Sequence, residues 1–191
     1  MADNVRCIKK SAKRHVDVFD FEPEFGISNT VIISAGVNDL SCHGLSARAL
    51  ADTVCGRLRN ICQKYRGTRF IFNSVLSVHN KHAWLNHEID VFNGIVYRFC
   101  LSIPNMAFFD SHSILLNDKI SRTLGGVIDL KDVRGVHITW QARKLITDQL
   151  VNAVELTSIL AGGKCVSHRL RNWNWPKRSS FARNEFDCVN G

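Results

Sequence analysis

V-I-I-S-A-G-V-N-D-L, at residues 31–40, is the stretch that decides the fold. Residues 30–35 are rich in β-branched side chains and carry no charge, as expected for a strand covered on both faces. Gly36 then allows the chain to turn sharply. The stretch therefore predicts a buried strand whose carboxyl end leads directly into a polar turn, Gly36-Val37-Asn38-Asp39.

Outward from this strand, apolar side chains recur at the spacing of either a helix or a strand. Helices are predicted at 46–66, 81–103 and 139–161, and further buried strands at 69–76 and 106–109. The alternating segment V-D-V-F-D-F at 16–21 favours a strand that pairs beside 31–36 and exposes one face. Strands that alternate with amphipathic helices indicate an α/β protein with a parallel sheet and helices on both faces.

The length of 191 residues fits one domain with tails. We expect a basic N-terminal tail at 1–14, the domain at 15–163 and a basic, Trp-containing C-terminal tail at 164–191.

No apolar run approaches the ~20 residues of a membrane-spanning helix, so no span is expected. The seven Cys include no CxxC pair, so buried thiols are expected rather than a metal site or disulfides. An intracellular location is favoured if Met1 is the true start.

Two polar positions carry candidate chemistry. An Asn just past a strand, such as Asn38, can direct its amide into the crevice at the carboxyl edge of the sheet, as an oxyanion donor would. The alternative is a turn in which Asn38 and Asp39 bond their own backbone. His137 lies in R-G-V-H-I-T at 134–139, directly before a predicted helix that Thr139 caps. It suits a general base, although a lone His is more often a surface or capping residue.

These two segments, about 100 residues apart, together resemble the SGNH (GDSL-like) hydrolase superfamily. G-V-N-D resembles the third block of that family and G-V-H-I-T its fifth, and the resemblance covers roughly 30–160. It implies a three-layer α/β/α sandwich with a flavodoxin-like parallel sheet, and ester hydrolysis through a Ser–His–Asp arrangement without a metal or other cofactor. Carried over by motif, Gly36 and Asn38 are oxyanion donors, His137 is the base, and the substrate is a small ester.

Three departures from the family pattern stand beside the resemblance. No Gly-Asp-Ser block precedes residue 31, so the nucleophile is not identifiable, and the second-block Gly has no clear counterpart. Arg134 occupies the position of the family's Asp, which leaves Asp132 as a displaced acid candidate. The chain is therefore expected to be N-terminally incomplete or degenerate, with impaired turnover.

The alternative function is an inactive SGNH-like module that binds RNA or a protein partner through a basic surface. The net charge is +8, which favours polyanionic partners. Aromatic and basic side chains alternate in the C-terminal tail and are the nucleic-acid candidates: Arg169, Arg171, Trp173, Trp175, Lys177 and Arg178. The opposing interpretation is that the two Trp pack on the domain while the charges stay in water.

Overall fold

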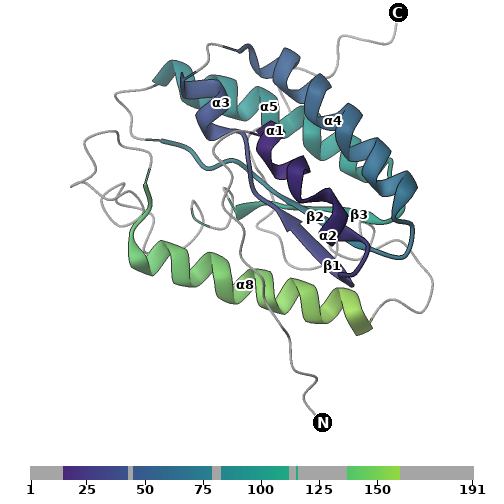
Figure 1. Ribbon diagram of the computed structural model, residues 1–191. Coiled ribbons are helices and arrows are strands. Elements are labelled where there is room, and N and C mark those ends of the chain that lie inside the picture. The colour runs from purple at the N-terminus through teal and green to yellow at the C-terminus, as the bar shows by residue number, and fades with distance from the viewer. Residues whose placement is uncertain (1–14, 43–44, 79–82, 112–114, 116–136, 160–191) are drawn as a thin grey trace, which may run out of the picture.

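The computed structural model describes residues 15–42, 45–78, 83–111, 115 and 137–159 (Figure 1). Three short helical segments come first, α1 (His15–Val18), η1 (Phe19–Phe21) and α2 (Glu22–Phe25). Strands and helices then alternate in the order β1 (Thr30–Ile33), α3 (Val37–Cys42), α4 (Ala47–Lys64), β2 (Arg69–Asn73), α5 (Ala83–Leu101), β3 (Met106–Phe109) and α8 (Trp140–Ile159).

The three strands form one parallel sheet in the order β1-β2-β3. Thr30 lies opposite Arg69 at the start of the first pair, and Phe70 lies opposite Met106 in the second. A parallel pair needs a crossover connection, which α3 with α4 supplies between β1 and β2, and α5 between β2 and β3. All three strands therefore have their carboxyl ends at the same edge of the sheet.

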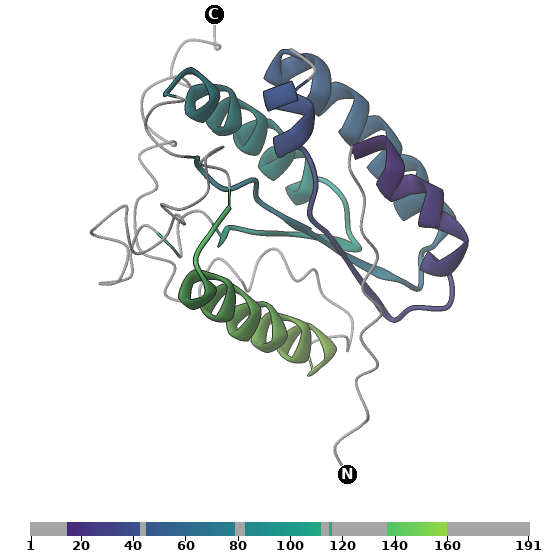
Figure 2. The same cartoon turned by 60° about the vertical axis from the view of Figure 1, so that its left-hand side comes forward.

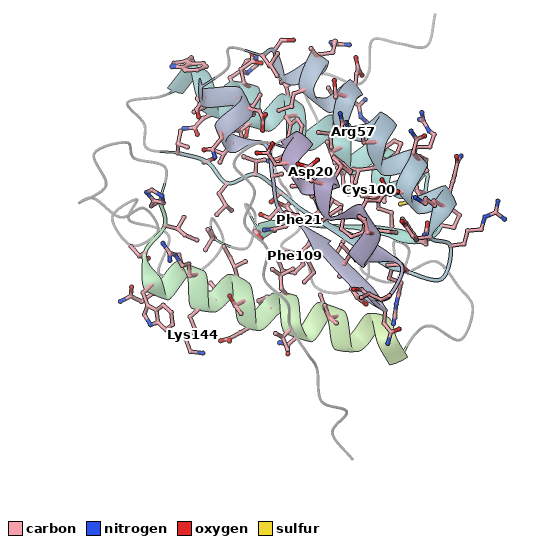
Figure 3. The ribbon with its side chains drawn as sticks, in the orientation of Figure 1. Asp20, Phe21, Arg57, Cys100, Phe109 and Lys144 are labelled. Atoms are coloured by element: carbon pink, nitrogen blue, oxygen red, sulfur yellow. The ribbon has the colours of Figure 1, made fainter. Side chains whose placement is uncertain are left out.

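Helices cover both faces of this sheet. Alternate strand residues, among them Phe70, Phe72 and Met106, belong to a core shared with α4 and α5. The intervening residues Ile71 and Phe109 join a second core with Ala142 and Ile146 of α8, and Phe109 can be found between the sheet and α8 in Figure 3. Figure 1 and Figure 2 show α8 on one side of the sheet and α3, α4 and α5 on the other. The predicted α/β/α sandwich with a flavodoxin-like parallel sheet is confirmed.

The strand predicted at 16–21 is wrong, because this segment is helical in α1 and η1. Val18, Phe19 and Phe21 pack against the α4–α5 core, and the guanidinium carbon of Arg57 lies 5.4 Å from the centroid of the Phe19 ring. At the far end, Lys64 Nζ lies 2.7 Å from Glu22 Oε1. The segment thus covers α4, and among the described residues β1 pairs with β2 alone.

Local sequence and distant side chains together define α4. Ser46 caps its start by accepting the N–H of Ala49 at 3.2 Å, and Glu88 of α5 accepts the N–H of Ala47 at 2.7 Å. At its other end, Nδ2 of Asn105 donates to the carbonyl groups of Cys62, Tyr65 and Thr68 at 3.0 to 3.2 Å. Since the last carbonyls of a helix have no partner within it, the bonds to Cys62 and Tyr65 satisfy the end of α4, and the bond to Thr68 holds the turn before β2.

The second strand ends at Asn73, earlier than the predicted residue 76. The chain beyond it is held by two side-chain amides of α5. Asn93 accepts the N–H of Val75 and donates to its carbonyl, and Asn86 does the same for Val78. Asn86 and Asn93 are seven residues apart in α5, which corresponds to a rise of about 10.5 Å along the helix. Val75 and Val78 are three residues apart in an extended segment, which spans about 10 Å. The two spacings agree, so two turns of α5 run alongside this segment.

Candidate active site

The carboxyl ends of the strands lead into the elements that carry the predicted site. The start of α3 follows β1, residues 74–78 follow β2, and Asp110 follows β3. Helix α8 begins at the same end of the sheet, on the opposite face from α3 (Figure 1 and Figure 2). In parallel α/β sheets this edge is where ligands bind.

Gly36 occupies a backbone conformation and a space that favour glycine. Its φ is 125°, in the region that L side chains rarely adopt. A Cβ built there would lie 3.1 Å from Cγ2 of Val75 and 3.3 Å from Cε1 of Phe92. The carbonyl of Gly36 accepts the N–H of Leu40 at 3.0 Å, so the chain passes directly from this glycine into α3.

Asn38 lies in the first turn of α3, so the alternative of a loop turn at Asn38 and Asp39 does not describe this segment. Asp39 and Leu40, which follow it, are both almost fully buried, whereas Asn38 is exposed. The buried pair anchors the helix, and the Asn38 side chain remains accessible at the carboxyl edge of the sheet. This position is compatible with the predicted oxyanion donor.

His137 is exposed and lies three residues before the start of α8. Its neighbour Ile138 packs against the α8-side core. Thr139 caps the helix as predicted, since its Oγ1 accepts the N–H of Ala142 at 3.3 Å and its carbonyl accepts the N–H of Arg143 at 3.0 Å. The imidazole is therefore carried on a short anchored segment at the start of a helix.

The remaining predicted site residues are the displaced acid candidate and the tail residues. Asp132 and the six tail candidates, Arg169, Arg171, Trp173, Trp175, Lys177 and Arg178, lie outside the described residues. Asp110 and Ser111 lie beside the site edge, but Ser111 is fully buried and donates its hydroxyl to Oδ1 of Asn73. The Ser111 hydroxyl therefore bonds to a residue of β2 and is not exposed as a nucleophile.

Sequence reasoning missed Ser34 and Asn73. Nδ2 of Asn73 donates to Oγ of Ser34 at 3.2 Å, while its Oδ1 accepts from Ser111. The available signal was positional, because each of these residues is polar and follows an apolar stretch of a strand at the edge where ligands bind.

Burial makes the described thiols poor nucleophiles. It raises the pKa of Cys55 to about 11 and that of Cys62 to about 12, and it also raises the pKa of Cys100. All three are free, buried cysteines, as predicted.

The described part of the chain contains no group of three or more His, Cys, Asp or Glu side chains that could hold a metal ion. No helix within it is long and apolar enough to span a membrane.

Comparison with solved structures finds the same architecture in other proteins. The chain is similar to a protein from Streptococcus pneumoniae provisionally described as a platelet activating factor, with 15% identity and a TM-score of 0.52 over 66% of this chain. It is also similar to a carbohydrate esterase family 3 protein from Talaromyces cellulolyticus, with 14% identity and a TM-score of 0.52 over 75% of this chain.

These likenesses show an SGNH-like fold. The chain spans 60% and 63% of the lengths of those two structures. No protein-family model matches the chain, and neither does any curated protein.

Proposed function

We propose that this domain is an ester hydrolase-like module whose site lies at the carboxyl edge of the sheet. One observation carries the proposal. In an SGNH-like fold, the Gly36–Asn38 turn and the segment of His137 both reach this edge, from opposite faces of the sheet. The resemblance of the same two segments to blocks of the SGNH hydrolases agrees with that placement.

In the proposed reaction His137 acts as general base and Asn38 as oxyanion donor. The imidazole takes the proton of the attacking hydroxyl as that oxygen bonds to the ester carbonyl carbon. The Asn38 amide donates to the carbonyl oxygen as it becomes an oxyanion. When the carbon–oxygen bond to the alcohol breaks, the imidazolium returns its proton to the leaving oxygen, so ester and water become acid and alcohol.

We propose that turnover by this chain is low, because it contains no Gly-Asp-Ser block and water must then serve as the attacking hydroxyl. In serine hydrolases that lack triad members, the oxyanion hole and binding alone leave rates roughly a thousandfold above the reaction in water. Asp132 is the carboxylate proposed to orient His137, and Arg134 stands where the family has its acid.

Hydrolysis of 4-nitrophenyl acetate by the purified chain and its His137→Ala variant tests this function. The wild type should exceed the uncatalysed rate, and His137→Ala should lose at least tenfold of that excess. His87→Ala is the matched control, because His87 is also exposed but belongs to α5. Equal rates for wild type and His137→Ala would reject the proposal.

A second candidate is the inactive module that binds RNA or a protein partner. The charge distribution favours it, because residues 15–47 contain no Lys or Arg, while the basic surplus is concentrated in 1–14 and 160–191. Replacing Arg169, Arg171, Lys177 and Arg178 by Ala should then reduce a salt-sensitive retention of RNA. RNA retention that neither salt nor these substitutions change would reject this candidate.

A further inference from the structure

Three polar side chains form one row across the sheet, on the face that α8 covers. Successive side chains of a strand point to opposite faces. Ile71 and Phe109 face α8, so Asn73, two residues after Ile71 in β2, continues toward the same face, and Ser111 reaches it from beyond the end of β3. Ser34 likewise follows Ile32 by two residues, and the bonds from Ser111 through Asn73 to Ser34 show that the three side chains meet.

The row has a defined direction of donation. Because Ser111 donates to Oδ1 of Asn73, the amide of Asn73 is oriented with Nδ2 toward Ser34. An amide nitrogen donates and does not accept, so Oγ of Ser34 is the acceptor in this contact. The Ser34 proton is consequently directed away from Asn73, and the Ser34 hydroxyl can act as a donor to another group.

Exposure rises along the same row. Ser111 is fully buried, Asn73 is 8% exposed, and Ser34 is exposed. As far as the structure describes the chain, the α8-side core contains residues of β2 and β3 but none of β1, so α8 does not cover the Ser34 end of the row. The row therefore presents one oriented, accessible hydroxyl at the edge of the sheet, two residues before Gly36.

We propose that Ser34 donates a hydrogen bond to an oxygen of the ester substrate, with Asn73 as the positioning residue that orients its hydroxyl. This inference rests on the proposed ester-hydrolysing site and adds to it a substrate contact from β1. A row serving only to satisfy buried polar groups would need no exposed terminus, whereas a substrate contact does.

The first test compares Ser34→Ala with wild type in 4-nitrophenyl acetate hydrolysis. Loss of one hydrogen bond to the reacting group should lower kcat/KM about tenfold. Ser102→Ala is the matched control, because Ser102 is also exposed but lies before β3, at the opposite end of the strands. Ser34→Ala also leaves Nδ2 of the nearly buried Asn73 without this acceptor, so its melting temperature should fall modestly, and activity is compared at a temperature where both proteins are folded.

The second test reverses the direction of donation with Asn73→Asp. A carboxylate would accept from both Ser34 and Ser111, which turns the Ser34 proton inward. We expect Asn73→Asp to lower kcat/KM as much as Ser34→Ala does, and the double variant to be no worse than Ser34→Ala. Additive losses in the double variant would show that Asn73 does not act through Ser34. If Asn73→Asp fails to fold, Ser34→Ala decides alone.

The outcomes separate this inference from the proposed function. If His137→Ala lowers hydrolysis and Ser34→Ala does not, the Ser34 contact is wrong and the esterase function stands. If the wild type shows no hydrolysis, 4-nitroacetanilide is added as a stable amide analogue, and the side-chain amide signal of Asn73 is followed by NMR. A shift that Ser34→Ala abolishes supports the contact, and no shift overturns it.

Discussion

Asn93 and Val75 form a reciprocal pair, in which the Val75 N–H lies 2.9 Å from Oδ1 of Asn93 and Nδ2 of Asn93 lies 2.8 Å from the Val75 carbonyl. The side-chain amide of Asn93 thus makes the two hydrogen bonds to Val75 that the backbone of a neighbouring strand would otherwise make. The same Val75 packs against the position where a Cβ on Gly36 would lie. Through these contacts α5 determines where the chain enters α3.

Replacing Asn93 by Ala should destabilise the domain, because it leaves the N–H and carbonyl of Val75 without these partners in a partly buried place. Each buried group left unsatisfied costs about 1–3 kcal/mol, so the loss of both partners should lower the free energy of unfolding by at least about 2 kcal/mol. Urea denaturation measures it. Asn60→Ala is the control, since Asn60 is exposed on α4, and Ala there should be neutral or slightly stabilising. Equal effects of the two substitutions would contradict the role of Asn93.

Two glycines should respond in opposite directions to substitution by Ala. Gly36→Ala combines a φ of 125° with close contacts to Val75 and Phe92, and should cost about 1–3 kcal/mol. Gly56 lies within α4 with no atom within 4 Å of an added Cβ, so Gly56→Ala should stabilise by about 0.5–1 kcal/mol. Thermal unfolding of both variants checks the pair, and a stabilised Gly36→Ala would refute the argument.

The side-chain amide of Asn105 should contribute to stability through the end of α4. Asn105→Ala removes a donor shared by three carbonyl groups and should lower the free energy of unfolding by about 1–2 kcal/mol. Asn105→Asp places a carboxylate against those carbonyls and against the negative end of the helix dipole, so it should destabilise further at pH 7. Denaturant titration decides the order, and an Asp variant as stable as wild type would show that donation from this side chain is unimportant.

Asp90 should make stability depend on pH. Burial raises its pKa from 3.8 to about 6, against the opposing charge of His87, and its buried Oδ1 has no hydrogen-bond partner among the described residues. The folded state therefore holds the proton more tightly than the unfolded state. Its contribution to stability is full below pH 3.8 and is lost as the pH rises through about 6.

Asn mimics the protonated form of Asp90, so the melting temperature of Asp90→Asn should match wild type near pH 4 and exceed it at pH 7. Melting curves across this range measure the difference. The control is Asp148→Asn, an exposed residue of α8 paired with Lys144 at 2.7 Å, which should gain nothing at pH 7. An advantage of Asp90→Asn that does not change with pH would contradict burial as the cause.

Much of the fold follows from local pattern. The stripe Leu50, Val54, Leu58 and Ile61 has the period of a helix, and Ser46 caps that helix as its residue type predicts. The apolar runs of β1, β2 and β3 have the composition of strands buried on both faces. Such signals are readable because each depends on residues close together in the chain.

The conformation of short or polar segments depends on their packing against the rest of the domain. V-D-V-F-D-F at 16–21 alternates as a strand does, but its aromatic side chains reach the α4–α5 core from a helical backbone, and Arg57 covers Phe19. Six residues are too few to distinguish the period of a strand from that of a helix, so the contact with α4 decides the conformation of this segment. The G-V-N-D segment likewise leads into α3, because the helical conformation buries Asp39 and Leu40.

The sequence by itself determined the alternation of strands and helices, the glycine turn after the first strand, and the candidate roles of Asn38 and His137. Only the tertiary structure decided that Ser34, Asn73 and Ser111 form one directed row, and that Asn86 and Asn93 hold the chain after β2. The physical reason is that period and capping act over a few residues along the chain. These hydrogen bonds join residues 8 to 39 positions apart, and they form only when parallel strand pairing and the packing of α5 bring the segments together.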